Sequence, residues 1–153
     1  MMEKDGLGMG TASPNLINIC VDRSMDGEIA GKFYCSYFSH SRKFDNIVQL
    51  LRSMEQSYNR ISFPQSAVQL RNFAGSRIAR GDEEIADAPV LDRDYIIGRR
   101  GICATFLVHV QYRQNATWQG SVLWAEKEKA AEFNSALELI MIIDNILRFG
   151  ALE

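Results

Sequence analysis

Residues 17–58 of the chain read INICVDRSMDGEIAGKFYCSYFSHSRKFDNIVQLLRSMEQSY, the order of a strand, a turn, a second strand and a helix. Residues 106–147 follow the same order 89 positions later, as FLVHVQYRQNATWQGSVLWAEKEKAAEFNSALELIMIIDNIL. Identical residues fall together at Gly31/Gly120, Phe44/Phe133 and Leu50/Leu139. One ββα unit is too small to bury its own apolar face, so the sequence predicts two units that pack together.

The first unit shows the periodicity of each expected element. Ile17, Ile19 and Val21 alternate with more polar residues, which is typical of a half-buried strand. Asp26-Gly27 is a strong hairpin signal and leads into a second strand over about residues 28–38. Ser39 or Ser41 is expected to cap the following helix. The apolar stripe of that helix is Phe44, Ile47, Val48, Leu51, Met54 and Tyr58.

The first strand of the second unit is expected to start near Thr105. Its residues alternate between the helix side (Phe106, Val108, Val110, Tyr112) and the outer side (Leu107, His109, Gln111, Arg113). A turn at residues 114–116 leads to a return strand over residues 118–126, and the last helix is expected over residues 130–147.

The last helix is apolar nearly all round, which indicates burial on two sides. Its expected core stripe is Phe133, Ala136, Leu137, Ile140, Ile143 and Leu147. A second apolar row is Leu139, Ile142 and Ile146, with Met141 beside it. We expect this row to bind a partner. A second copy of the chain is favoured slightly over the middle segment or the first helix as the element that covers the row.

These elements predict an α+β fold: a four-stranded antiparallel sheet of two hairpins, with both helices on one face. We expect a flexible leader over residues 1–14 and a single domain over residues 15–153. The two units occupy residues 15–58 and 105–149. Residues 59–104 form a long irregular segment with a short helix near residues 66–73.

Composition limits the classes of function. The net charge of −2 argues against a strongly basic nucleic-acid binder. No apolar run approaches the length of a membrane span, so no membrane partner is expected. Three cysteines without metal-ligand spacing fit a reducing cytoplasm.

The chain offers little for catalysis. His40 and His109 are its two histidines, and neither HExxH nor CxxC occurs. We therefore expect no catalytic residues, no metal and no cofactor, and interpret the protein as a non-enzymatic interaction or regulatory module.

The alternative function is nucleic-acid binding. Arginines of the middle segment present planar forks suited to phosphate: Arg71, Arg77, Arg80, Arg99 and Arg100. An open outer sheet face would add Tyr34, His109 and Arg113 as a platform for bases. Against this, the arginines can pair with the acids of residues 82–94, and the middle segment can cover the sheet face.

Residues 22–27, DRSMDG, fit the pattern D-x-S-x-x-G, which resembles the second signature of PilZ domains. That resemblance implies binding of a cyclic dinucleotide and an R-x-x-x-R signature upstream, where this chain has a single basic residue, Lys4. We interpret the string as hairpin-turn chemistry. The strings FPQ (63–65) and YRQNATWQG (112–120) resemble small uncharacterised proteins of anaerobic Firmicutes, which implies no function.

Overall fold

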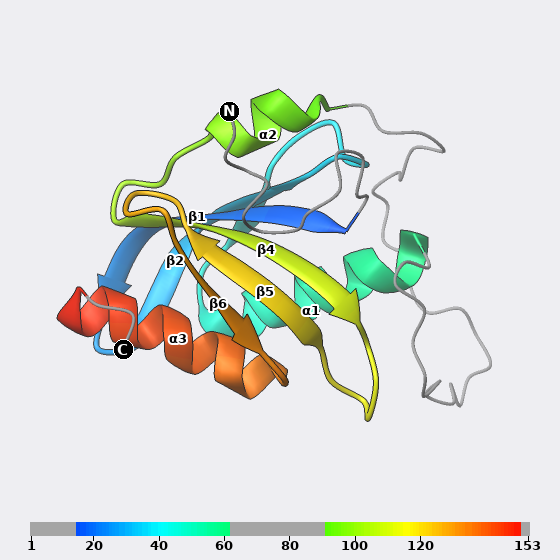
Figure 1. The fold of residues 1–153 in the computed structure, drawn as a ribbon. Helices are drawn as coiled ribbons and strands as arrows, with labels where there is room; N and C mark the ends of the chain where they lie inside the picture. The colour runs from blue at the N-terminus through cyan, green and yellow to red at the C-terminus, as the bar shows by residue number, and fades with distance from the viewer. Residues whose placement is uncertain (1–14, 62–90, 151–153) are drawn as a thin grey trace.

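The computed structural model describes residues 15–61 and 91–150. These residues form one antiparallel sheet of six strands, in the order β3-β2-β1-β4-β5-β6 (Figure 1). The strands are β1 Leu16–Met25, β2 Glu28–Cys35, β3 Arg42–Phe44, β4 Ala104–Tyr112, β5 Gln119–Trp124 and β6 Lys129–Phe133. The helices are α1 Ile47–Ile61, α2 Arg93–Gly98 and α3 Ala136–Phe149. The predicted α+β class and antiparallel sheet are confirmed.

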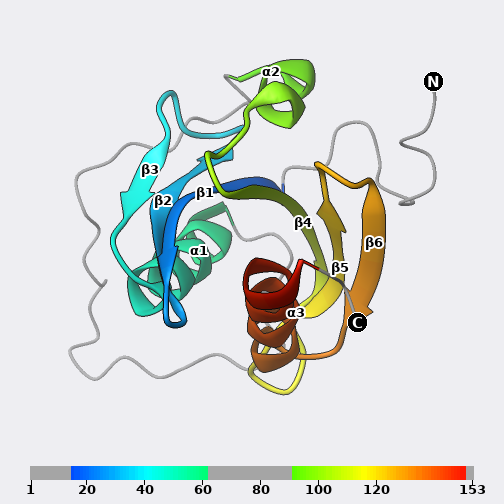
Figure 2. The same ribbon diagram turned by 90° about the vertical axis from the view of Figure 1, so that its left-hand side faces the viewer.

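The two long helices lie on the same face of the curved sheet, and α2 lies on the other face (Figure 2). The main core fills the space between the sheet and α1 and α3, because the strands and helices turn their apolar sides toward one another. Its members include Ile17, Ile19, Phe33, Phe106 and Val108 from the sheet and Leu50, Met54, Leu139 and Ile143 from the helices.

Both halves use the same strand register. Val21 lies opposite Gly31 in the first hairpin, and Val110 lies opposite Gly120 in the second. The same two glycines then pair with the next strand, Gly31 with Phe44 and Gly120 with Phe133. Each of these pairs in the first half recurs 89 positions later in the second, so the hairpins within each predicted unit are paired alike around the glycine.

A bulge interrupts each hairpin at the same place, after Val21 in β1 and after Val110 in β4. The glycine opposite each bulge is required by space rather than by backbone conformation. A Cβ on Gly31 would lie 2.0 Å from the carbonyl oxygen of Cys20, and one on Gly120 would lie 2.0 Å from that of His109. The paired glycines therefore mark close backbone approach beside a bulge.

A pseudo-two-fold axis relates the halves. At the centre of the sheet, β1 pairs with β4 in antiparallel fashion, and Asn18 lies opposite Leu107. These two positions are themselves 89 residues apart, so the axis passes through this pair. On one side of this central pair Ile17 lies opposite Val108, and on the other side Ile19 lies opposite Phe106. The axis exchanges these two pairs.

The sheet has six strands instead of the expected four, because each half contains a short third strand. Phe44 and Phe133 end these strands, whereas the sequence interpretation counted both as the first residues of helical stripes. The expected helix over residues 130–147 is therefore a strand followed by α3. The error arises because Phe44 and Phe133 lie three residues before Ile47 and Ala136, which is a helical spacing, although both phenylalanines belong to strands.

Both long helices begin with a reciprocal cap, which explains where they start. In α1, Asn46 Oδ1 accepts the Gln49 N–H (2.8 Å), and Gln49 Oε1 accepts the Asp45 N–H (2.8 Å). In α3, Ser135 Oγ accepts the Glu138 N–H (3.1 Å), and Glu138 Oε1 accepts the Asn134 N–H (2.8 Å). The cap of α1 is thus Asn46 and not Ser39 or Ser41, since the strand over residues 42–44 delays the helix.

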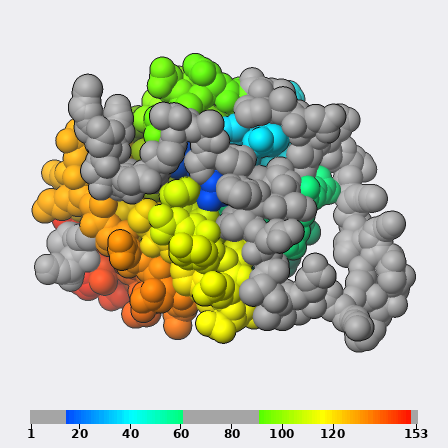
Figure 3. Space-filling model, turned by 45° about the vertical axis from the view of Figure 1, so that its right-hand side comes forward, coloured from blue at the N-terminus to red at the C-terminus, as the bar shows by residue number. Residues whose placement is uncertain are grey.

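The helix α2 packs on the outer face of the sheet through a buried asparagine. Asn18 Nδ2 donates to the carbonyl oxygens of Ile96 (2.6 Å) and Arg99 (3.0 Å), and both Asn18 and Ile96 are fully buried. In Figure 3 the atoms of α2 (green) and of the β4–β5 hairpin (yellow) lie at separate ends of the visible surface. The pair at the centre of the sheet, Asn18 and Leu107, is buried on this outer face.

Some expectations lie outside the described residues, namely the leader over residues 1–14 and the short helix near residues 66–73. Within residues 15–61 and 91–150, none of the helices has the length and apolar content needed to span a bilayer.

Candidate functional site

The end of β4 turns an arginine toward the helices. Arg113 is 3% exposed, whereas Tyr112 is 57% exposed, the reverse of the alternation expected from the sequence. The bulge after Val110 is the cause, because one extra residue moves every later side chain of the strand to the opposite face. Arg113 therefore does not belong to the outer sheet face where we expected it.

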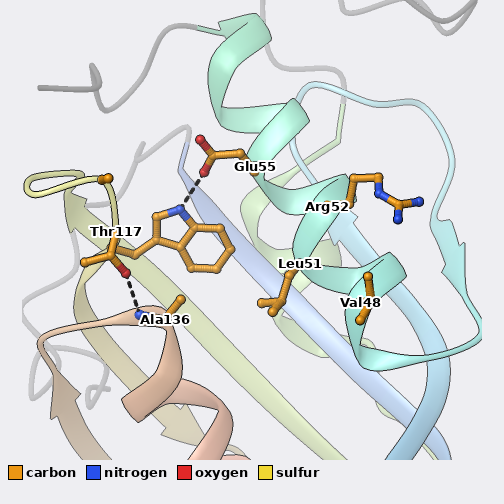
Figure 4. Close-up of a pocket in the computed structure, with 8 residues that line it drawn as sticks. Val48, Leu51, Arg52, Glu55, Thr117 and Ala136 are labelled. Carbon is orange, nitrogen blue, oxygen red and sulfur yellow. Dashed lines mark hydrogen bonds between the residues drawn. The ribbon is translucent and has the colours of Figure 1, made fainter. Parts of the chain in front are cut away.

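Arg113 is part of a compact polar cluster with α1 and the β4–β5 connection. Its Nη1 donates to Asn59 Oδ1 (2.8 Å) and lies 3.3 Å from Glu55 Oε2. The Trp118 indole N–H donates to the other Glu55 oxygen (2.7 Å; Figure 4). The Arg113 guanidinium lies 5.7 Å from the Tyr58 ring centre, and the Tyr58 and Trp118 rings meet edge to face at 5.6 Å. We call these five residues the Glu55 cluster.

The charges of the Glu55 cluster are compensated internally. Each carboxylate oxygen of Glu55 accepts one hydrogen bond, and the buried Arg113 supplies the opposite charge. Burial raises the pKa of the Tyr58 phenol well above its ordinary value, so this group stays neutral. Through the hydrogen bonds that Glu55 and Asn59 accept from Trp118 and Arg113, the cluster fastens α1 to the β4–β5 hairpin.

Beside this cluster lies a hollow of about 330 Å³ between α1, the β4–β5 connection and the start of α3 (Figure 4). Its lining is Val48, Leu51, Arg52, Glu55, Ala116, Thr117, Trp118 and Ala136. Thr117 Oγ1 accepts the Ala136 N–H (2.8 Å), which fixes the first turn of α3 against the connection. Figure 4 shows the Arg52 head group pointing away from Thr117 and Ala136, so its stem contributes to the wall. The hollow is mainly apolar.

Exposed apolar side chains lie on both helices near the hollow: Val48 lines it, Leu137 follows the lining residue Ala136, and Met141 lies one turn further along α3. Val48 is 57% exposed, Leu137 is 64% exposed and Met141 is 57% exposed. We call the outward surface of the two long helices the helical face, made of Val48, Leu51, Arg52, Leu137, Ile140 and Met141. Apolar side chains gathered around a hollow are typical of a surface that binds another protein.

The exposed side of α3 differs from the expected one. Leu139 and Ile146 are 1% and 4% exposed and lie in the core, Ile142 is partly buried against it, and Met141 alone of the expected partner row is exposed. Leu137, which we assigned to the core stripe, points outward. A helix apolar on most sides has several rows of similar hydrophobicity, so hydrophobicity alone could not set its rotation.

Of the described residues expected to bind nucleic acid, Tyr34, Arg99 and Arg100 lie at α2 on the outer side of the sheet, whereas Arg113 lies on the helix side. Tyr34 meets the Tyr95 ring edge to face at 6.2 Å. The Arg99 and Arg100 side chains donate to backbone carbonyls of α2, at Tyr95 (3.2 Å) and Ile97 (2.7 Å). His109 is half-buried on β4, and burial lowers its pKa. Arg71, Arg77 and Arg80 lie outside the described residues.

The string at residues 22–27 forms the β1–β2 hairpin, as interpreted. Asp26 and Gly27 adopt positive φ angles of 53° and 86°, which suit the tight turn. Asp22 Oδ1 accepts the Ile102 N–H (3.0 Å), and its other oxygen lies 3.7 Å from Lys32 Nζ. The aspartate that carries the PilZ resemblance thus fixes the loop before β4.

Sequence reasoning missed the Glu55 cluster. Glu55 falls within the expected first helix and Trp118 at the start of the expected return strand, and no sequence pattern connects them. The available signal was Gly120 within a strand, because an interior glycine often marks a bulge, and a bulge reverses the direction of Arg113.

No family model, curated protein or solved structure matches this chain. Among the described residues, no three of His, Cys, Asp and Glu gather in a group that could hold a metal ion.

Proposed function

We propose that this protein is a non-enzymatic interaction module that binds another protein through the helical face. The observation that carries the proposal is the apolar hollow flanked by the exposed Val48 and Leu137. Both belong to the first turn of a long helix, and both helices are held by caps and by a shared core. A rigid surface of this kind loses little conformational entropy when a partner binds.

The contacts of the Glu55 cluster support a binding role for this face. Glu55 and Trp118 line the hollow, yet their polar atoms are already paired with each other and with Arg113. The Arg52 head group points away from Thr117 and Ala136 (Figure 4), so a partner that enters the hollow meets an apolar wall without having to desolvate an unpaired charge there. Apolar side chains of the partner are the groups that this surface favours.

The experiment compares the wild-type chain with Val48→Glu and Ile102→Glu as baits in parallel affinity isolations. Ile102 is the matched control, since it is an exposed apolar residue (83%) in the loop before β4, away from the helical face. We expect a protein that is retained by the wild type and by Ile102→Glu but lost with Val48→Glu. Equal retention by all three chains would refute the proposal. Circular dichroism melting checks that both variants fold.

A further inference from the structure

The pseudo-two-fold axis gives the helical face a symmetry of its own. Val48 and Leu137 occupy equivalent positions in the two halves, 89 residues apart, and both are more than half exposed. The two helices run in opposite directions (Figure 1) and lie next to each other on the same face of the sheet (Figure 2). A homodimer with a true two-fold axis requires a patch that is complementary to itself, and a face with nearly equivalent halves meets this requirement readily.

The two helices of this face carry opposite net charges. Arg52, Glu55 and Arg60 give α1 a net charge of +1, and Glu138, Asp144 and Arg148 give α3 a net charge of −1. Arg52 is exposed and has no ion-pair partner among the described residues, whereas both oxygens of Glu55 are occupied. The first turn of α1 contains no acid to offset its helix dipole, and the first turn of α3 contains Glu138.

Two face-to-face arrangements of identical chains are compatible with a two-fold axis in the plane of the interface. One places α1 over α1 and α3 over α3, which opposes like charges in both contacts. The other places α1 of each copy over α3 of its partner, which brings opposite charges together twice. The second arrangement also brings the exposed Leu137 of one copy toward the hollow beside Leu51 of the other.

We infer that the helical face binds a second copy of this chain, with α1 of each copy lying over α3 of the other and the hollow occupied by the partner's Leu137. This inference rests on the proposed function, because it names the protein that the helical face binds. Its source is the combination of an apolar hollow, an exposed leucine at the equivalent position, and opposite charges on the two helices.

The first test is sedimentation velocity of the purified full chain over a range of micromolar concentrations. We expect the wild type and Ile102→Glu to associate into dimers, and Leu137→Glu to stay a monomer with unchanged melting, since Leu137 is mostly exposed. A wild type that remains monomeric throughout would overturn the inference. In that case, a partner lost from Val48→Glu in the affinity isolations would leave the proposed function standing, so the two failures are distinguishable.

The second test reverses the charges of the helices. Arg52→Glu changes the net charge of α1 from +1 to −1 and should weaken dimerisation about tenfold, because two attractive contacts become repulsive. Adding Asp144→Lys to the same chain makes α3 positive, and the double variant should associate as the wild type does. Recovery is expected only when α1 lies over α3. A double variant as weak as Arg52→Glu would overturn the arrangement, and melting curves show whether each variant folds.

Discussion

Position 55 of α1 and the equivalent position 144 of α3 both carry an acid, but the two acids have different partners. Glu55 accepts from Trp118 and Arg113 across the boundary between the halves. Asp144 pairs with Arg148, one turn further along its own helix, at 3.3 Å. The acid in the first half therefore joins two elements, while the acid in the second half stabilises one.

The difference follows from the hairpin that each helix meets. The positions equivalent to Trp118 and Arg113 in the first half are Ile29 and Ser24. Ile29 is a buried apolar residue and Ser24 is exposed, so neither gives Asp144 an ion-pair partner. Residues that are alike in both halves set the fold, and two residues that differ, Trp118 and Arg113, build the Glu55 cluster beside the hollow. The following predictions test this division, from the largest expected effect to the smallest.

Substituting the shared glycines should have the largest effect. Gly31→Ala and Gly120→Ala each place a Cβ 2.0 Å from a carbonyl oxygen of the neighbouring strand, and both backbones must shift. We expect each change to lower the free energy of unfolding by roughly 3 kcal/mol or more, to a similar extent in both halves. Urea denaturation measures this. Gly98→Ala is the control, because nothing lies within 4 Å of its added Cβ. A large difference between Gly31→Ala and Gly120→Ala would break the equivalence of the halves.

Truncating the two acids should lower the free energy of unfolding by different amounts in the two halves. Glu55→Ala removes a charged partner from the buried Arg113 and the acceptor of the Trp118 indole, which should cost about 1–3 kcal/mol. Asp144→Ala removes an exposed pair within one helix and should cost no more than about 0.5 kcal/mol. Chemical denaturation followed by tryptophan fluorescence measures both changes. Equal costs would show that the Glu55 cluster contributes nothing beyond an ordinary surface pair.

The repeat itself could be predicted from the sequence because apolar periodicity and hairpin turns are local signals. The offset of 89 places Gly31 on Gly120 and Leu50 on Leu139, and the structure pairs or packs both sets alike. The third strands could not be predicted in the same way. A segment such as Lys129–Phe133 has no strand signal of its own, and pairing with β5 determines its conformation.

The site was harder to predict because its direction depends on a bulge. One extra residue in β4 places Arg113 on the opposite face of the sheet from the one expected. Strict alternation of side chains along β4 therefore gives the wrong face for the residues after the bulge. The rotation of α3 was missed for a different reason. Leu137 and Leu139 are chemically identical, and only the packing of the capped helix on the sheet decides which one is buried.

Removing the helix caps should lower stability equally in the two halves, by less than the glycine substitutions do. Asn46→Ala and Ser135→Ala each remove the acceptor for a first-turn N–H, and each should cost about 1 kcal/mol of unfolding free energy. Thermal melting of both variants measures the effect. Ser39→Ala, at an exposed position before β3, is the control and should melt as the wild type does. A lower melting point for Ser39→Ala than for Asn46→Ala would contradict the assigned start of α1.

The smallest effects concern Cys20 and His109, which occupy equivalent positions on the outer side of the sheet. Burial raises the pKa of the Cys20 thiol from 9.0 to about 11, and burial lowers the pKa of His109 from its ordinary 6.5. Both groups are therefore held neutral by the same cause, but they act at opposite ends of the pH range.

Because the unfolded chain binds a proton at His109 more readily than the folded chain, stability should fall as the pH drops below about 6.5 toward the lowered pKa. For Cys20 the sign is reversed: the folded chain keeps its proton longer, so stability should fall as the pH rises above 9.0 toward about 11. Urea midpoints across this range should drop at both ends. His109→Gln should flatten the acid side alone, with His40→Gln as the exposed control. Cys20→Ala should reduce the alkaline slope without removing it, because burial also raises the pKa of the Cys35 thiol and of the Tyr58 phenol. If His109→Gln leaves the acid slope unchanged, burial at this position does not control the protonation of His109. The two positions would then be equivalent in backbone placement only, and not in the effect of burial on their side chains.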